Sequence, residues 1–285
     1  MTLRTTMLWV LAALLPVDAV LLYAYGLDWL LQAVTLILLG QCLDALTQYL
    51  RRNAIGADSL IATAVAMNLL AVALPPNLPM YVLIVAALSS IWLARDFFGG
   101  LGQNVFNPAM VGYVVCLVSF PDLMSQWPSP DGLSGATPLD HARATKLGFD
   151  LAAQPNTHLL ALSISALIGG LVLLYRRIIG WHIPVTLLAT LGSLALAISP
   201  VTPSPLTIAE HLGFGAAVFA AFFIATDPVS AAISTRGRCI YAALLGLLIW
   251  SIREFGQYPD SVAFAVLIAN SAVPLIDRLL TRGAR

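Results

Sequence analysis

The sequence predicts an all-α, polytopic membrane protein with about ten transmembrane helices, and three observations lead to this fold class. The 285-residue chain is 59% hydrophobic and only 10% charged, whereas soluble domains carry about 25% charged residues. Its mean hydropathy is +0.88. Apolar runs approaching the roughly 20 residues that a helix needs to cross a bilayer recur along the whole length. We therefore expect one integral membrane domain over residues 1–285.

Short polar or turn-forming segments separate the apolar runs and define the individual spans. Each span is expected to be helical, because an unpaired backbone group is costly in lipid. The predicted spans are Met7–Tyr25, Leu27–Leu50, Ser59–Leu74, Pro79–Phe98, Gln103–Phe120, His158–Tyr175, Trp181–Ile198, Leu206–Ile224, Ile240–Arg253 and Ser261–Leu279.

The basic residues predict the orientation of these spans, because cytoplasmic loops carry an excess of Lys and Arg. With a cytoplasmic N-terminus, Arg143 and Lys146 fall outside, in the one long loop. One span more or fewer would scatter the arginines over both faces, so we expect both termini in the cytoplasm. The arginines placed inside are Arg4, Arg51, Arg52, Arg176, Arg177, Arg236, Arg238, Arg278, Arg282 and Arg285.

Composition excludes several classes of function. The formal net charge is zero, and no basic patch indicates a nucleic-acid partner. The three cysteines, Cys42, Cys116 and Cys239, lie far apart without metal-binding spacing. We expect them to be small buried hydrophobic residues, with a metal or iron–sulfur site shared between spans as the alternative. No catalytic residue and no metal ligand are predicted.

The one long polar segment, residues 121–157, joins the fifth and sixth predicted spans. Loops of this length are usually functional or disordered, and the arginine distribution places this one outside the cytoplasm. It contains Asp131-Gly132-Leu133-Ser134-Gly135-Ala136-Thr137. The small residues would leave the Thr137 hydroxyl accessible on flexible backbone. The alternative is an ordinary turn in which Thr137 caps a helix that begins at Pro138.

Two further segments break helical regularity at predicted membrane depth. Residues 99–102 hold three glycines, each costing about 1 kcal/mol in a helix; Asn107 is then a suitable cap for a helix that begins at Pro108. Asp227 and Pro228 repeat this pattern in the second half. Broken helices in both halves are typical of inverted repeats around a ligand site, and helix starts offer N–H groups to ligand oxygens. Ordinary proline kinks are the alternative.

Ionisable residues inside the membrane are candidate proton or sodium ligands. Span-end capping, or pairing with Arg95, is the alternative for each of them. The candidates are Asp18, Asp44, Asp96, Asp227 and Glu254. Among the histidines, His141 lies in the long loop, while His158, His182 and His211 fall at span ends, where we expect them to be solvated.

Several motifs occur along the chain in a fixed order: residues 99–104 (GGLGQN), 106–113 (FNPAMVGY), 131–139 (DGLSGATPL), 226–231 (TDPVSA), and 258–260 (YPD) followed by 262–267 (VAFAVL). Together they resemble the D subunit of the bacterial Rnf electron-transport complex, and the similarity extends from about Leu11 to Asp277. The related B subunit of the sodium-pumping NADH:quinone reductase shares the flavinylated motif, which corresponds here to residues 131–137, and is the nearest alternative.

This resemblance implies a function. A flavin transferase would esterify the phosphate of FMN to the Thr137 hydroxyl, with Asp131, Ser134, Gly135 and Ala136 forming the acceptor motif around it. The loop would face the periplasm, and the chain would relay electrons between ferredoxin- and NAD-linked subunits in the inner membrane while sodium or protons move.

The resemblance also implies a second flavin, such as riboflavin, bound noncovalently in related subunits. We expect any such site near the two broken helices, at Asn107 and Asp227. Arg95 departs from the family pattern, in which a lysine is expected, and the two cations differ in how they bind acceptors. Two other classes of function stay open: a small-solute channel or transporter without a redox role, and a scaffold whose loop docks a partner.

Overall fold

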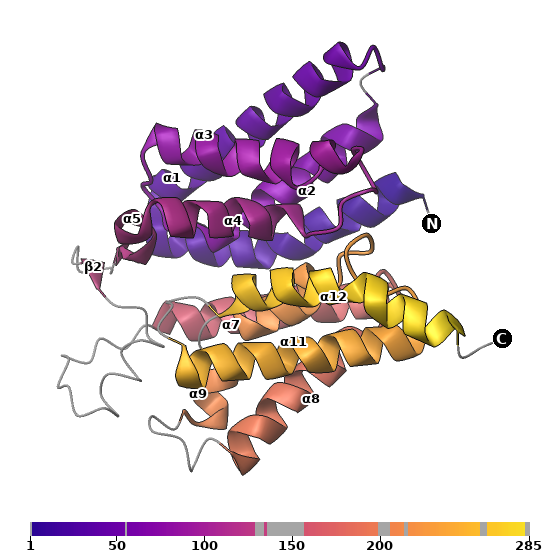
Figure 1. Cartoon of the computed structure of the whole chain (residues 1–285). Helices are drawn as coiled ribbons and strands as arrows, with labels where there is room; N and C mark the ends of the chain where they lie inside the picture. The colour runs from indigo at the N-terminus through magenta and orange to yellow at the C-terminus, as the bar shows by residue number, and fades with distance from the viewer. Residues whose placement is uncertain are drawn as a thin grey trace. The chain divides into compact units, whose positions relative to one another are not determined.

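The computed structural model describes residues 2–54, 56–128, 134–135, 157–198, 206–213, 216–256 and 261–282. Within these ranges the chain is helical apart from two short strands and connecting segments (Figure 1). It forms two compact units, Met1–Ser134 and Gly135–Arg285. The predicted all-helical membrane fold class is confirmed.

The long helix α1 (Leu3–Leu50) consists of two antiparallel arms. Its backbone leaves helical geometry at Gly26, with φ 67° and ψ −153°. Figure 1 shows the indigo N-terminal arm and the second arm as separate rods. Both arms pack on α2 (Ala57–Ala73), and their hydrogen bonds to it and to Pro75 just beyond it run in opposite order. The pairs are Arg4–Asp58 and Asp18–Asn68 for the first arm, and Gln41–Leu60 and Gln32–Pro75 for the second. The arms match the first two predicted spans.

The remainder of the first unit continues the alternation of spans. After α2 the chain crosses back in a helix whose last turn widens into a π-helix, a rare form often found at functional sites. The elements are α3 (Met80–Leu88), the π-helix η1 (Ser89–Leu93), the 3-10 helix η2 (Asp96–Phe98), α4 (Pro108–Ser119), α5 (Pro121–Ser125), β1 (Trp127–Pro128) and β2 (Ser134–Gly135). β1 and β2 pair in a two-stranded sheet.

The first unit has an arginine-bearing end and an aromatic end. Arg51, at the end of α1, donates to the carbonyl oxygen of Gly99. At the other end Tyr25 and Trp127 contact each other, with ring centroids 6.2 Å apart. Tyr and Trp rings are enriched at both membrane interfaces, whereas basic residues concentrate at the cytoplasmic one, so the arginine is the residue that bears on orientation.

The second unit also consists of helices and contains a second π-helix. Its elements are α7 (Thr157–Tyr175), α8 (His182–Ala197), α9 (Ile208–Gly213), α10 (Ala217–Phe219), the π-helix η4 (Ala220–Ile224), α11 (Thr235–Phe255) and α12 (Val262–Arg282). α8 and α11 pack closely at Gly246, where a Cβ atom would lie 2.9 Å from the carbonyl oxygen of Leu187. Glycine at such a crossing lets two backbones approach each other.

The first predicted helix break is confirmed and the second needs a correction. α4 begins at Pro108 with Asn107 as its N-cap. The helix of the fifth predicted span therefore begins later than Gln103, where the sequence predicted its start. Pro228, however, begins no α-helix: residues 228–230 form a turn, and α11 begins only at Thr235, capped by Ser234. The Asp227 side chain is used within that turn. The inverted repeat stays a prediction.

Three helical segments of the described chain are long and apolar enough to cross a membrane: Leu3–Leu50, Met80–Phe98 and Val262–Leu280. Shorter apolar helices are Ala57–Ala73, Pro108–Ser119, Leu160–Tyr175 and His182–Ala197. Many large apolar side chains lie on the outside, including Leu15, Leu38 and Leu279 at about 60% exposure. An apolar exterior of this kind suits contact with lipid.

Gly26 provides a test of the α1 hairpin. Its φ and ψ lie in a region that only glycine adopts readily, so Gly26→Ala should cost about 1–3 kcal/mol and lower the thermal unfolding midpoint in detergent. Gly192→Ala is the matched control, because Gly192 lies inside α8 with no atom near an added Cβ. That control should be neutral or stabilising. Equal midpoints for the two variants would contradict the reversal at Gly26.

Candidate functional site

A buried guanidinium, that of Arg95, joins three segments of the first unit. Arg95 follows the π-helix η1 and is only 4% exposed. Its Nη2 donates to Asp44 Oδ1 at 2.5 Å, its Nη1 donates to Thr63 Oγ1 at 2.7 Å, and its Nε donates to Asp96 Oδ1 at 2.8 Å. Asp44 belongs to α1 and Thr63 to α2, so one side chain ties the end of η1 to both helices.

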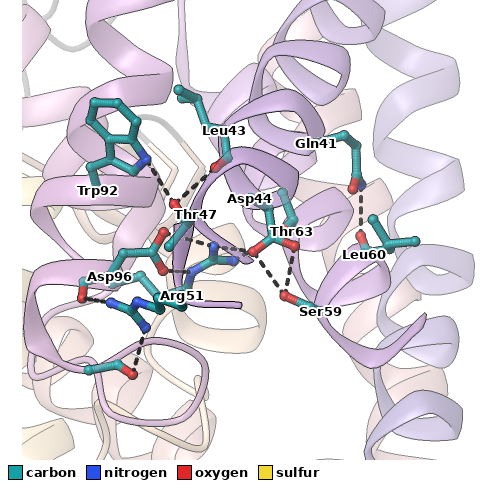
Figure 2. A network of polar contacts seen from close by, with 12 residues as sticks. Gln41, Leu43, Asp44, Thr47, Arg51, Ser59, Leu60, Thr63, Trp92 and Asp96 are labelled. Atoms are coloured by element: carbon teal, nitrogen blue, oxygen red, sulfur yellow. Dashed lines mark hydrogen bonds and ion pairs between the residues drawn. The ribbon is translucent and has the colours of Figure 1, made fainter. Parts of the chain in front are cut away.

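Asp44 is fully buried in this network. The Ser59 hydroxyl lies 2.9 and 2.7 Å from its two carboxylate oxygens, as Figure 2 shows. A buried charge is tolerated when a partner and further hydrogen bonds satisfy it. The predicted pairing of Arg95 with a nearby acid is therefore confirmed. Both Asp44 and Asp96 are ion-paired with Arg95.

Arg51 extends the network into the glycine-rich segment. Its Nη2 donates to the Asp96 carbonyl oxygen at 2.5 Å and its Nη1 to the Gly99 carbonyl oxygen at 3.1 Å. Gly99 and Gly100 have φ angles of 120° and 104°, which side chains with a Cβ rarely adopt. The predicted unwound backbone is confirmed. The Asp96 carbonyl oxygen also accepts from the Gly99 N–H at 3.2 Å, and Arg51 adds a charged donor to it and to the Gly99 carbonyl oxygen.

Asn107 ends the unwound segment. Its Oδ1 accepts a hydrogen bond from the Met110 N–H at 3.2 Å, and the residue is 2% exposed. This is the N-cap contact expected from the sequence. A role of Asn107 as a flavin ligand stays a prediction.

In the second unit, Asp227 follows the π-helix η4 after Ala225 and Thr226. Its Oδ2 accepts from the Ser230 hydroxyl at 2.8 Å, and its Oδ1 lies 3.4 Å from the Val229 nitrogen. Asn270, fully buried on α12, donates to the Ser230 carbonyl oxygen and to the Tyr241 hydroxyl, both at 3.1 Å. Asp227 therefore belongs to a polar cluster that joins the turn to α11 and α12; its predicted contact with a flavin stays a prediction.

The expectation that His211 is solvated is wrong. His211 is fully buried, and its Nε2 lies 3.0 Å from Glu254 Oε1. Arg253 donates to the His211 carbonyl oxygen and, at 3.0 Å, to the Ser261 hydroxyl. The cause is a tertiary contact: the end of the short helix α9 packs against the end of α11. The position of His211 within a predicted span cannot indicate such a contact. His182 is part-buried at the start of α8, and His141 lies outside the described residues.

The cysteines differ from the expectation of uniform burial. Cys116 is buried, Cys239 is part-buried and Cys42 is exposed on the outer face of α1.

The flavin motif is described only in part. Asp131, Ala136 and Thr137 lie outside the described residues, while Ser134 and Gly135 form strand β2, paired with β1. The start of the loop is fixed, because Trp127 of β1 contacts Tyr25 at the end of the first arm of α1. Sequence reasoning missed this contact and the pairing of the strands. The available signal was an aromatic residue at a predicted span end.

Comparison with known proteins agrees with these features. The family described as NQR2, RnfD, RnfE matches residues 1–284. The chain belongs to this family. It is 37% identical to the D subunit of the ion-translocating oxidoreductase complex of Yersinia pseudotuberculosis serotype I (strain IP32953), over 96% of this chain and 92% of that protein.

Two further relatives have the same name. The identity is 40% for the protein of Pectobacterium atrosepticum (95% of this chain, 91% of that protein) and 41% for that of Alcanivorax borkumensis (94% and 88%). The resemblance of this NQR2, RnfD, RnfE family member to D subunits, which its motifs indicate, is confirmed.

Replacing Arg95 tests the network. Arg95→Met leaves two buried carboxylates without their cation, which should cost about 3–5 kcal/mol. Arg4→Met is the matched control: the Arg4–Asp58 pair has 55% and 52% exposed side chains, and such pairs contribute at most about 1 kcal/mol. Adding Asp44→Asn to Arg95→Met should restore part of the loss. Thermal unfolding in detergent measures all three; an Arg95→Met variant as stable as Arg4→Met would contradict a supporting role.

Proposed function

We propose that this chain is the D-type subunit of an ion-translocating oxidoreductase complex in the bacterial inner membrane, where it relays electrons through FMN attached covalently to Thr137. The observation that carries the proposal is the D-G-x-S-G-A-T sequence at residues 131–137, in a family member whose relatives are named as the D subunit of such a complex. The chain supplies binding and orientation, and FMN, when attached, supplies the redox chemistry.

The described part of the loop fits a covalently attached flavin. Ser134 and Gly135 are paired with β1, and Gly135 precedes Thr137 by two residues. Trp127, the first residue of β1, is held on Tyr25. The acceptor threonine therefore follows a paired stem whose base is fixed on α1.

The proposed orientation places this aromatic end at the periplasm and both termini in the cytoplasm. The arginines support this orientation. Arg51 lies at one end of the first unit. In the second unit Arg238 lies near Gly180, which comes shortly after Arg176 and Arg177 in sequence, at one end of that unit. Cytoplasmic ends carry such basic residues. Electrons from the cytoplasm would then reach a flavin on the opposite face.

The proposed partners are the other subunits of an Rnf-type complex, which link ferredoxin and NAD, together with the flavin transferase that would modify Thr137. The names of the relatives favour the D subunit over the B-type subunit of a sodium-pumping NADH:quinone reductase. A second, noncovalent flavin such as riboflavin is also proposed. Asn107, buried in the first unit, and the Asp227 cluster in the second are each, taken separately, candidate contacts for it.

Flavin fluorescence of the denatured chain tests the proposal. Wild type, Thr137→Ala and Thr145→Ala are each co-expressed with a flavin transferase and separated on a denaturing gel. We expect a fluorescent band for wild type and for Thr145→Ala, which changes a threonine of the same loop outside the motif. The band of Thr137→Ala should be dark, because the phosphodiester has no acceptor hydroxyl.

A dark wild-type band, alongside a known transferase substrate that labels, would overturn the proposal and favour a transporter or scaffold. Fluorescence that persists in Thr137→Ala would show that the flavin is attached to a different residue. Equal protein in the three bands is the control for expression.

A further inference from the structure

One intramembrane carboxyl, that of Asp18, has no cationic partner among the described residues. Asp18 lies in the first arm of α1, inside the predicted span 7–25, and is partly buried. Its Oδ2 accepts from Asn68 Nδ2 at 3.0 Å. Its Oδ1 is shielded from solvent and lacks a hydrogen-bond partner. An ionised carboxylate in this position is costly, because among the described residues its charge is offset by the Asn68 amide alone and by no cation.

Among the described residues, the helices around Asp18 place no charged side chain against its carboxyl. Asp58 is held by Arg4, Asp44 is held by Arg95, and Asp28 is exposed. Asn68 is thus the one polar group bonded to this carboxyl in the described part of the first unit. The other ionisable side chains of α1, α2 and α3 are Arg4, Tyr23, Tyr25, Asp28, Cys42, Asp44, Tyr49, Asp58 and Tyr81.

We propose that Asp18 and Asn68 form a proton-binding site within the membrane, at which the Asp18 carboxyl takes up and releases a proton. The site binds a proton rather than a metal cation, because hard cations require several oxygen ligands, about six for Mg²⁺. The described groups here are one carboxyl and one amide.

Asn68 suits both protonation states of Asp18. An asparagine amide has N–H donors and a carbonyl acceptor. Its Nδ2 donates to the ionised carboxylate, and after protonation its carbonyl oxygen can accept from the carboxylic acid at the same place. Neither state then loses the hydrogen bond, so the proton is exchanged without breaking the contact between α1 and α2.

The site lies toward the aromatic end of the first unit. Asp18 precedes Tyr25 by seven residues, which is about 10 Å along a helix, and Tyr25 holds the base of the flavin loop through Trp127. A proton bound at Asp18 is therefore close to the end of the unit that carries the proposed electron carrier. The site itself is independent of that proposal.

Carbodiimide labelling tests the site directly. N,N′-Dicyclohexylcarbodiimide modifies protonated carboxyls: the carboxyl oxygen adds to the carbodiimide carbon, the proton passes to a nitrogen, and no atom leaves. Trypsin should release residues 5–51 as one peptide, which carries Asp18, Asp28 and Asp44. Fragmentation of this peptide from labelled membranes compares the three carboxyls within one wild-type molecule, with Asp44, bound to Arg95, as the internal control.

We expect Asp18 to be labelled at neutral pH and Asp44 to stay unlabelled, and labelling of Asp18 should fall about tenfold per pH unit once the acid ionises. Asn68→Leu should move this profile to higher pH, because the carboxylate loses its donor. An unchanged profile in Asn68→Leu would contradict the role of Asn68 in the site.

Labelling of Asp18 no greater than that of Asp44 at every pH would overturn the inference. Protection by sodium chloride, but not by choline chloride, at fixed pH would also overturn it by assigning the site to sodium. Because labelling needs neither flavin nor electron flow, it can fail while the Thr137 proposal stands.

Discussion

The buried guanidinium of Arg95 is the interaction on which the first unit depends. A helix that widens into a π-helix and then unwinds through three glycines replaces the regular helical hydrogen bonds by turn-type ones, and an unpaired backbone group is costly in lipid. Arg95 joins this point to α1 and α2 through Asp44 and Thr63, and Arg51 binds the carbonyl oxygens of Asp96 and Gly99. The unwound segment is therefore held by charge and hydrogen bonding rather than by regular helix.

The second unit uses the same order of elements with different chemistry. In both units a π-helix is followed by an alanine, one further residue and an aspartate. These are Ala94 and Asp96 after η1, and Ala225 and Asp227 after η4. Asp96 accepts from a buried arginine, whereas Asp227 accepts from the Ser230 hydroxyl. The two breaks thus share the order of π-helix, alanine and aspartate, and the first is built around an ion pair.

Local patterns predicted much of the fold, and contacts distant in sequence explain the failures. Asn107 and Pro108 were assigned correctly because an N-cap depends on residues three positions apart. Asp227 and Pro228 have the same local pattern, but Asp227 bonds Ser230 within a turn and Ser234 caps the helix instead. His211 is buried by Glu254, 43 residues later, and Trp127 is fixed by Tyr25 from the first helix. A motif predicts Thr137 as the flavin acceptor, and that stays a prediction. Spacing alone could identify neither the His211–Glu254 contact nor the Trp127–Tyr25 contact.

The central claim is that this membrane protein carries its electron carrier covalently on one threonine. Mass spectrometry of the chain purified from its own membranes tests this most directly, without an added transferase. The account predicts the mass of one FMN joined by a phosphodiester, and fragmentation that places it on Thr137. A loop of unmodified mass in a chain purified from an active complex, or a flavin on another residue, would contradict it.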